Sequence, residues 1–324
     1  MNLSIRIETT GGPEVMQLVE TPLPAPGPGE IQLRHEAIGL NFIDVYHRSG
    51  LYRVPLPGGL GSEGAGVVTA LGPGVAGFAV GDRIAYAGGP LGAYSERRNL
   101  PARHAVKLPP EIPAETAAAM MLKGMTAYYL LHLTFAVRPG HTILVHAAAG
   151  GVGSVLVPWA RHLGARVIGT AGSADKARLA RAAGCNEVIL YREQDVAAAV
   201  KEFTSGQGVD VVYDSVGKDT FAGSLDSLRR RGLLVSFGNA SGKVPPIEPV
   251  LLSDKGSLFL TRPKLADYVA TREELTAAAA ALFGAIAEGV VQATIGQRYP
   301  LREVAQAHAD LEARRTTGTT LLTV

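Results

Sequence analysis

A glycine-rich turn near the middle of the chain has the residue types that let a backbone approach a phosphate. Residues 143–154 read ILVHAAAGGVGS, in which three apolar residues and a histidine precede a run of small residues. When such a turn joins a buried strand to a helix, the helix N–H groups and the positive end of its dipole hold a pyrophosphate. The alternative is a tight turn that only connects the two elements. The interpretation therefore depends on the elements on either side.

The neighbouring segments favour a dinucleotide-binding unit. Residues 143–145 predict a buried strand, residues 155–163 predict a helix that ends at Gly164, and residues 165–169 predict a second strand. The sequence further predicts helices over 176–183, 195–203 and 220–228, and strands over 187–190, 209–214 and 232–237. Strands that alternate with helices in this way indicate a doubly wound parallel sheet.

The end of the second predicted strand carries information about the cofactor. Folds that bind NAD usually place an acidic residue there, where it holds the ribose hydroxyls. Residues 167–173 read VIGTAGS, without a carboxylate, and Lys176 follows three residues after Ser173. A 2′-phosphate needs cationic and hydroxyl donors and would be repelled by a carboxylate. The segment therefore predicts NADPH, and the alternative for Lys176 is a solvated lysine on a helix surface.

The first 110 residues are rich in short strands and glycine turns. Residues 16–19 and 31–34 alternate in polarity as half-buried strands do, and the connector PLPAPGPGE at 22–30 cannot be helical. The sequence also predicts a short helical turn over 41–49 that ends at Gly50, and turn-and-strand segments over 61–68 and 80–84. Many short strands with glycine turns predict a partly closed barrel.

Prolines mark the boundary between these two regions. After PPEIP at 109–113, residues 114–133 are alanine-rich and apolar at helical spacing, which predicts a largely buried helical segment. The remaining predicted elements are an edge strand over 258–261, a long helix over 272–288, a strand over 295–299, a helix over 304–312 and a strand over 319–324. The last three are expected to return to the first domain.

Composition limits the classes of protein that need to be considered. The 324 residues suffice for about two domains, and 47% hydrophobic residues with 19% charged residues are typical of a globular protein. A net charge of +2 gives no strong nucleic-acid footprint. The single cysteine, Cys185, excludes an internal disulfide and a cysteine-cluster metal site, and is interpreted as a small packing residue. We expect a cytoplasmic location, because we find neither a signal peptide nor a run of about 18 apolar residues.

Seven sequence blocks, in order, carry a resemblance to a known family. They are GGPEV (11–15), GLNFID (39–44), RSGLY (48–52), GSEGAGVV (61–68), HAAAGGVG (146–153), YDSVG (213–217) and SFGN (236–239). Over essentially its whole length the chain resembles the medium-chain dehydrogenase/reductase superfamily, and within it the zinc-free NADPH:quinone oxidoreductases, the group that includes zeta-crystallin. The resemblance implies an α/β fold with a GroES-like, partly closed β-barrel catalytic domain over 1–122. A Rossmann-type NADPH-binding domain would span 123–262, and residues 263–324 would return to the catalytic domain.

The zinc-dependent relatives differ from this chain at two positions that decide the chemistry. They place a cysteine where this chain has Asn41 and a histidine where it has Ser62. An amide and a hydroxyl are poor zinc ligands, and Asp44 and Glu63 alone do not make a site, so no metal is expected. Without a Lewis acid we do not expect alcohol oxidation. Hydride delivery to an already electrophilic acceptor, such as a quinone, remains possible because the cofactor carries that chemistry.

The resemblance also assigns residues to parts of the cofactor. It places Asn41, Lys123 and Thr126 at the nicotinamide end. The other implied contacts are Gly151 and Val152 along the pyrophosphate; Ser173, Lys176 and Tyr191 at the 2′-phosphate; Gly172 as a further cofactor contact; Ser215, Phe237, Gly238 and Asn239 after strands of the sheet; and Thr261, Arg262 and Arg314, with Arg315 as an alternative to Arg314. The substrate pocket would include Asn41, Tyr46 and Tyr52, and the alternative for the two tyrosines is core packing. His146 is interpreted as a core histidine rather than a general base.

The implied function is NADPH-dependent reduction of quinones, with no catalytic residue assigned because a solvent proton could complete the hydroquinone. The cofactor would bind in the cleft between domains. One alternative is a zinc-free reductase of activated carbon–carbon double bonds in enals or enones. Another is a nucleotide-binding protein with a structural or RNA-binding role, against which the near-neutral charge argues. The resemblance also implies a homodimer through the nucleotide domain, with residues 255–261 as the candidate edge.

Overall fold

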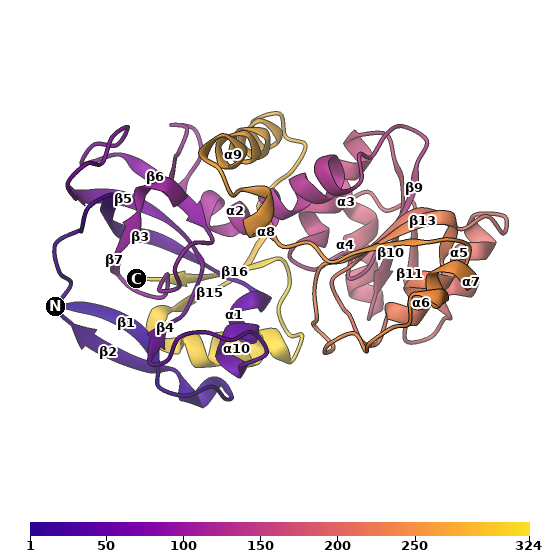
Figure 1. Cartoon of the computed structure of the whole chain (residues 1–324), viewed down its shortest axis with the longest axis horizontal. Helices are drawn as coiled ribbons and strands as arrows, with labels where there is room; N and C mark the ends of the chain where they lie inside the picture. Colours follow the sequence, from indigo (N-terminus) through magenta and orange to yellow (C-terminus); the bar gives the residue numbers. More distant parts are fainter. The chain divides into compact units, whose positions relative to one another are not determined.

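The computed structural model describes residues 1–324 and divides the chain into two compact units. Unit 1 comprises Met1–Met125, Tyr268–Gly284 and Ala293–Val324, and unit 2 comprises Thr126–Asp267 and Ala285–Gln292. In Figure 1 the indigo start and the yellow end of the chain both lie in unit 1. No helix combines the length and the apolar character that a membrane crossing requires.

Unit 2 contains one six-stranded parallel sheet in the order β11-β10-β9-β12-β13-β14. Its strands are β9 (Thr142–Val145), β10 (Arg166–Ala171), β11 (Glu187–Leu190), β12 (Val209–Asp214), β13 (Leu228–Ser236) and β14 (Phe259–Thr261). Its helices are η3 (Tyr129–Thr134), α3 (Gly153–His162), α4 (Ala174–Ala182), α5 (Val196–Phe203), α6 (Phe221–Asp226) and α7 (Val250–Asp254). This strand order is that of the dinucleotide-binding folds, so the predicted doubly wound sheet is confirmed.

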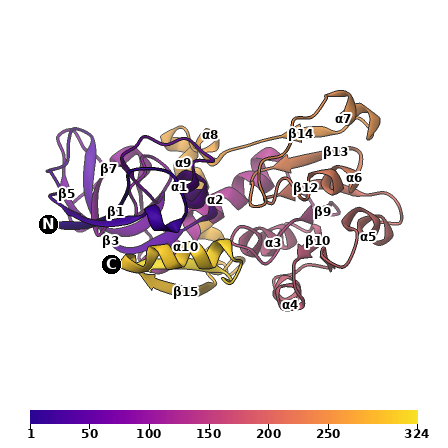
Figure 2. The same cartoon turned by 90° about the horizontal axis from the view of Figure 1, so that it is seen from below.

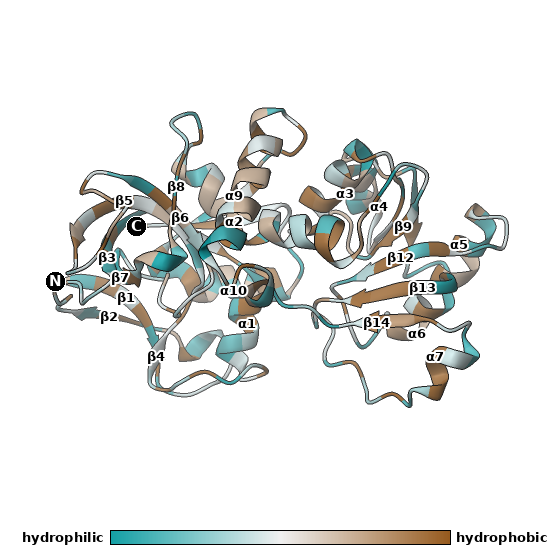
Figure 3. Ribbon diagram, turned by 45° about the horizontal axis from the view of Figure 1, so that its top comes forward, coloured by the Kyte–Doolittle hydropathy of each residue, from teal (hydrophilic) through white to brown (hydrophobic).

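Both faces of this sheet are covered. Alternate side chains of each strand point to opposite faces, so neighbouring residues of one strand report on the two layers. Leu144, Ile168 and Val212 are fully buried in a core that includes residues of α5 and α6. Tyr213 follows Val212 and therefore points to the other face, where its hydroxyl donates to the Leu130 carbonyl of η3 at 3.0 Å. Figure 3 shows hydrophobic colour on β13, the strand that contains the buried Leu234 and Val235.

Cys185 lies within this layered core and is buried. A Cβ atom added at Gly169 of β10 would stand 2.7 Å from the Cys185 sulfur, so the glycine provides the room for this side chain. Burial raises the pKa of the Cys185 thiol to about 12. The thiol is therefore a packing group without nucleophilic character, as the sequence predicts.

Unit 1 is built around β3, the longest strand of the chain. Its strands are β1 (Asn2–Ile7), β2 (Gln17–Thr21), β3 (Glu30–Leu40), β4 (Gly58–Gly59), β5 (Glu63–Leu71), β6 (Arg83–Ala87), β7 (Arg97–Pro101), β8 (Val106–Lys107), β15 (Ile295–Pro300) and β16 (Thr319–Thr323). Seven strands form one sheet along the path β15-β16-β3-β5-β6-β8, with β7 paired to β3. The sheet β2-β1-β4 is separate, and neither sheet closes on itself.

The helices of unit 1 complete its core. They are η1 (Pro13–Val15), α1 (Phe42–Ser49), η2 (Ala102–His104), η4 (Leu301–Glu303) and α10 (Val304–Glu312), while α2 (Ala114–Tyr128), α8 (Leu265–Tyr268) and α9 (Arg272–Ala287) pass from one unit into the other. Val304 and Ala307 of α10 pack into the same core as Ile38 of β3. Figures 1 and 2 show α10 in yellow alongside β15, and both elements belong to unit 1.

One predicted helix differs from the structure in its last turns. The sequence predicts a single helical segment over 114–133, but α2 ends at Tyr128 and a six-residue π-helix, η3, follows it. An aromatic cluster lies at this change of helix type. Tyr128, just before η3, and His132, within it, pack against Trp159 of α3 with ring centroids 5.0 to 6.2 Å apart. The sequence prediction does not separate the two, because π-turns are rare and appear mostly as single turns within helical segments.

Candidate active site

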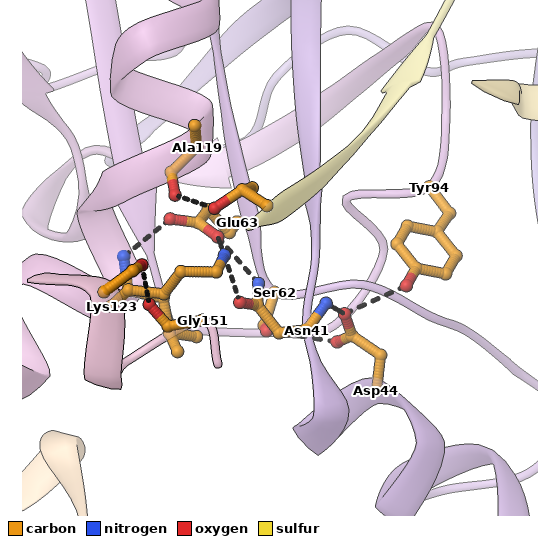
Figure 4. Close-up of polar contacts among 11 residues, drawn as sticks. Asn41, Asp44, Ser62, Glu63, Tyr94, Ala119, Lys123 and Gly151 are labelled. Carbon is orange, nitrogen blue, oxygen red and sulfur yellow. Dashed lines mark hydrogen bonds and ion pairs between the residues drawn. The ribbon is translucent and has the colours of Figure 1, made fainter. Parts of the chain in front are cut away.

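Three polar side chains meet in the interior of unit 1. The Asn41 amide nitrogen donates to Glu63 Oε2 at 2.6 Å, and the Asn41 amide oxygen accepts from Lys123 Nζ at 2.6 Å. Lys123 Nζ also lies 3.5 Å from Glu63 Oε2, and all three residues are at least 95% buried. Figure 4 shows these side chains converging from three different elements. Because each side of the amide has one fixed partner, the orientation of Asn41 is determined.

The local fold explains how these side chains come together. Asn41 is the extended residue before α1, Glu63 opens β5 and Lys123 lies in α2. A Cβ atom added at Gly39 of β3 would stand 2.3 Å from both Glu63 Oε2 and the Ala118 carbonyl. Glycine is therefore required there for the carboxylate and α2 to approach β3 so closely. The backbone N–H of Leu122 also donates to Glu63 Oε1 at 2.6 Å, which fixes the second carboxylate oxygen.

A second buried carboxylate, Asp44, lies in the first turn of α1. Its Oδ2 accepts from the Asn41 backbone N–H at 2.9 Å and from the Tyr94 hydroxyl at 2.9 Å, and its Oδ1 accepts from the Ser62 hydroxyl at 3.2 Å. The first contact is half of a capping box, which explains a carboxylate at this helix position. Burial raises the pKa of Asp44 to about 6, against the effect of these three hydrogen bonds.

Tyr94 connects Asp44 to a charged group at the surface of unit 1. The Tyr94 hydroxyl lies 3.0 Å from Nε2 of His308, and Arg48 Nη1 lies 3.2 Å from Nδ1 of the same histidine. Arg48 also donates to the Glu312 carboxylate at 2.8 Å, and Glu312 is partly exposed. Burial and the nearby guanidinium lower the pKa of His308 to about 3, so this imidazole is neutral.

The donor set of unit 1 does not fit a zinc ion. The residues at the two positions where zinc-dependent relatives have ligands are Asn41 and Ser62, an amide and a hydroxyl that are already bonded to Glu63 and Asp44. The Lys123 ammonium beside them has no lone pair to offer. Across residues 1–324 no group of three or more His, Cys, Asp or Glu side chains is arranged to hold a metal.

In unit 2 the glycine turn has the form expected of a phosphate-binding loop. It follows β9 and leads into α3, and the Ala148 N–H donates to the Thr170 carbonyl of β10 at 3.0 Å. A Cβ atom at Gly153 would stand 2.5 Å from the Ala147 carbonyl, so only glycine allows this closure. The structure places the predicted pyrophosphate contacts, Gly151 and Val152, in the turn just before the first turn of α3.

The predicted 2′-phosphate contacts lie together at the ends of β10 and β11. Ser173 caps α4, because its hydroxyl accepts from the Lys176 N–H at 3.4 Å. A Cβ atom at Gly172 would stand 2.7 Å from the Tyr191 hydroxyl, which brings Tyr191 beside this cap. The acidic residue that follows Ser173 most closely in the sequence is Asp175. Its side chain is exposed and bonded to Arg178 at 2.6 Å.

The carboxyl ends of β12 and β13 bring the next group of predicted residues together. Asp214 Oδ1 accepts from the N–H groups of Val216 and Gly217, and both carboxylate oxygens lie within hydrogen-bond distance of the Thr220 hydroxyl. A Cβ atom at Gly238 would stand 2.3 Å from the Ser215 carbonyl. The predicted contacts that share this site are Ser215, Phe237, Gly238 and Asn239.

The same carboxylate explains His146. Ser224 donates to Asp214 Oδ2 at 2.7 Å, and His146 Nε2 lies 3.0 Å from the Ser224 oxygen. Because the single hydroxyl proton of Ser224 goes to Asp214, the histidine donates to the serine and cannot act as its base. His146 Nδ1 lies 3.2 Å from the Thr170 hydroxyl. Both ring nitrogens are bonded within a 98%-buried side chain, as the prediction of a core histidine requires.

The remaining predicted residues lie at several points of the two units. Thr126 is buried in α2, Thr261 ends β14 with Arg262 after it, and Arg314 has a positive φ of 60° in the turn after α10. Arg315 is bonded to Asp310 at 2.5 Å. The rings of Tyr46 and Tyr52 are 5.1 Å apart, edge to face. Tyr46 is buried and Tyr52 is half-buried.

Comparison with known proteins places both units in one family. A family model described as an alcohol dehydrogenase GroES-like domain matches residues 27–110, and one described as a zinc-binding dehydrogenase matches residues 151–284. A quinone oxidoreductase from Pseudomonas aeruginosa is 55% identical over 98% of this chain and 98% of its own length. The chain belongs to the quinone oxidoreductase family of the medium-chain dehydrogenase/reductases.

Two further relatives of the family bear on ligands. The crystal structure of the Escherichia coli quinone oxidoreductase complexed with NADPH has a TM-score of 0.98 and 51% identity, covering 99% of this chain and 100% of that one. A 2-haloacrylate reductase from Burkholderia is 47% identical over 99% of both chains. The fold is therefore shared with proteins named for two different kinds of acceptor.

Proposed function

We propose that the protein reduces quinones by hydride transfer from NADPH. The observation that carries this proposal is the full-length similarity to quinone oxidoreductases, one of them solved with NADPH, combined with a donor set in unit 1 that does not fit zinc. Bound NADPH supplies the hydride. The chain's own part is to hold the cofactor and the acceptor in contact, to exclude water and to place charge near the acceptor oxygen.

The Asn41–Glu63–Lys123 cluster fixes the position of an ammonium group in unit 1, where it is paired with the Glu63 carboxylate. Lys123 is held by Asn41 and Glu63 over short distances, and its side chain is almost completely buried. A buried ammonium stabilises negative charge that develops on an acceptor oxygen more strongly than a solvated one would. In this proposal Lys123 provides part of the electrostatic assistance that a metal gives in zinc-dependent relatives.

The choice of NADPH over NADH tests the cofactor assignment. We propose that Ser173, Lys176 and Tyr191 hold the 2′-phosphate, because they lie at one end of the sheet. A charge-assisted hydrogen bond contributes about 1.5–3 kcal/mol, so Lys176→Ala should lower the NADPH-over-NADH preference in kcat/KM by about 10- to 100-fold. The control is Lys201→Ala on the exposed side of α5, which should leave the ratio unchanged. An unchanged ratio in Lys176→Ala would contradict the assignment.

A second candidate activity is reduction of an activated carbon–carbon double bond. It is favoured by the similarity to the 2-haloacrylate reductase. Both activities begin with the same hydride, so the acceptor decides between them. NADPH oxidation measured with 1,4-benzoquinone, an alkenal and 2-chloroacrylate, at equal protein concentration, ranks them by kcat/KM. The proposed function predicts the highest value with the quinone.

We also propose that the protein forms a homodimer through the edge of the unit 2 sheet. β14 is the last strand of that sheet, and Phe259 at its start is 58% exposed. An exposed apolar edge strand is a template for pairing with a second copy. Light scattering should give twice the chain mass, and Phe259→Lys should shift it toward the monomer. A cytoplasmic location is supported by the low cysteine content.

A further inference from the structure

The hydrogen bonds that lead from Arg48 to Asp44 have a fixed direction. A guanidinium can only donate, so Nδ1 of His308 must accept from Arg48. The neutral imidazole then carries its one proton on Nε2 and donates it to the Tyr94 oxygen. The Tyr94 hydroxyl in turn donates to Asp44 Oδ2. Each donor in this chain therefore points toward the carboxylate.

This direction closes one side of Asp44 to proton exchange. Tyr94 cannot give up its proton unless His308 replaces it, and His308 cannot be recharged because Arg48 does not release protons. All of these side chains are at least 98% buried, so water does not take the place of the missing donor. The Asn41 backbone N–H that also bonds Asp44 is likewise not an exchangeable acid. Protons can therefore reach or leave Asp44 only through Ser62.

Ser62 is suited to this role because a hydroxyl donates and accepts at the same time. When Asp44 is charged, Ser62 donates to its Oδ1. When Asp44 is protonated, the carboxyl group donates to the Ser62 oxygen, and the hydroxyl proton is free to point elsewhere. The titratable groups that act directly on Asp44 are Tyr94 and Glu63, while Arg48 acts on Tyr94, and with a pKa of about 6 the Asp44 carboxyl takes up or releases its proton close to neutrality.

We propose that Ser62 donates the proton that completes the reduced acceptor and that Asp44 recharges Ser62. This inference rests on the proposed quinone reduction. The resemblance equates Ser62 with a metal-ligand position of zinc-dependent relatives, and in this proposal its hydroxyl, which is bonded to Asp44 at 3.2 Å, faces the acceptor oxygen. Asp44 acts through Ser62 and is a positioning residue and proton reservoir.

The step balances in atoms and charge. The hydride from NADPH reduces the quinone by two electrons and leaves one quinone oxygen as an anion. The Ser62 O–H bond breaks as the new O–H bond of the hydroquinone forms, and the Asp44 proton moves to the Ser62 oxygen. Asp44 is left as a carboxylate that accepts from Asn41, Tyr94 and Ser62. After product release, one proton from water returns to Asp44 through Ser62.

The test is the pH dependence of kcat with 1,4-benzoquinone and saturating NADPH, between pH 5 and 8. In the wild-type protein kcat should fall as pH rises through about 6, because Asp44 loses its proton there. Asp44→Asn keeps an oxygen for Asn41 and Tyr94 and an N–H for Ser62, but it holds no transferable proton. Its kcat should be lower by about 10²- to 10⁴-fold at pH 5 and should not vary with pH.

Three more variants separate proton transfer from a structural role. Ser62→Ala should also give a kcat that does not vary with pH. The double variant, Asp44→Asn with Ser62→Ala, should be no slower than either single variant. Tyr94→Phe removes a hydrogen bond that favours the charged carboxylate, so the fall in kcat should move to higher pH. The matched control is Asp82→Asn, a hydrogen-bonded carboxylate of the same unit, whose profile should match the wild type.

Two outcomes would overturn the inference. One is an Asp44→Asn profile that falls at the same pH as the wild type, and the other is a loss of kcat by the same factor at every pH. NADPH affinity and the melting temperature of each variant show whether it is folded. If Asp44→Asn does not fold, the pH profile of Ser62→Ala provides the test instead. If the wild-type protein does not oxidise NADPH with any quinone, the proposed function fails instead, which is a distinct result.

Discussion

Each unit contains a buried aspartate surrounded by hydroxyls and a histidine, but the two are built differently. In unit 2, Asp214 accepts from two backbone N–H groups and from Thr220 and Ser224, all within the next ten residues of the chain. In unit 1, Asp44 accepts from one backbone N–H and from the hydroxyls of Ser62 and Tyr94, which come from other strands and loops. One carboxylate is held mainly by its own loop, and the other by side chains brought from a distance.

The difference separates a fixed carboxylate from one whose hydrogen bonds can rearrange. A backbone N–H cannot reverse its role, so Asp214 stabilises the loop after β12 in a single arrangement. The Ser62 hydroxyl can donate or accept, so this one partner of Asp44 permits a change of protonation without a change of fold. The same residue types thus serve loop geometry in one unit and, in our proposal, proton movement in the other.

The largest expected effect is on stability in unit 2. Asp214→Ala leaves two backbone N–H groups and two hydroxyls without their acceptor, so the free energy of unfolding should fall by about 3–5 kcal/mol. Urea denaturation measures this loss. Asp175→Ala, which removes an exposed ion pair, should cost less than about 0.5 kcal/mol. A loss for Asp214→Ala as small as that of this control would mean that the loop does not depend on the carboxylate.

The next effect is the pH dependence of stability that His308 imposes on unit 1. Its pKa of about 3 lies far below its unfolded value of 6.5, so only the unfolded chain binds a proton as pH falls below 6.5. Stability should therefore decrease from pH 7 to pH 5, by about 2 kcal/mol from this residue. His308→Gln should remove that part of the slope, as measured by urea denaturation at both pH values.

Two other buried groups set the background to this measurement. His35, with a pKa also lowered to about 3 by burial and by Arg98, contributes a decrease of the same sign. Asp44 opposes both, because its raised pKa lets the folded protein bind a proton as pH falls below about 6. An unchanged slope in His308→Gln would show that this imidazole is not held neutral in the folded protein.

The smallest effects come from the two serines beside the carboxylates. Ser62→Ala and Ser224→Ala each remove one hydrogen bond to a buried aspartate, so each should lower the free energy of unfolding by about 1 kcal/mol. Their kinetics should differ, since Ser224→Ala should keep the wild-type shape of the pH profile of kcat and Ser62→Ala should not. If both variants kept that shape, the contrast between the two aspartates would be structural only.

Much of unit 2 could be predicted from the sequence because its signals are local. The glycine turn, the apolar strands and the alternating helices predict the parallel sheet. In unit 1 a local signal also sufficed for one helix, since the predicted helix over 304–312 coincides with α10. The strands and α-helices that were missed are β1, β4, β7, β8, α7 and α8. β1 does carry a signal, because Leu3, Ile5 and Ile7 alternate with polar residues. The other five elements are at most five residues long, which is too short for a periodic pattern.

The site of unit 1 was predicted only in part, because its contacts are not local. Asn41, Asp44, Ser62 and Glu63 stand out by their positions in motifs, but nothing near Lys123 in the sequence indicates that its ammonium contacts Asn41. Tyr94 and His308 carry no motif and are 214 residues apart. Asp44 was the one residue that indicated such contacts. A buried carboxylate that binds no metal requires hydrogen-bond donors from elsewhere in the fold.

The single thiol of the chain gives unit 2 a built-in reporter. Cys185 packs against β10 and is shielded from solvent, so a thiol reagent can react with it only after that part of the unit opens. The rate of chemical labelling therefore measures how often the nucleotide-binding layer comes apart. A dinucleotide that binds the closed form should slow the labelling in proportion to its occupancy, without any engineered probe.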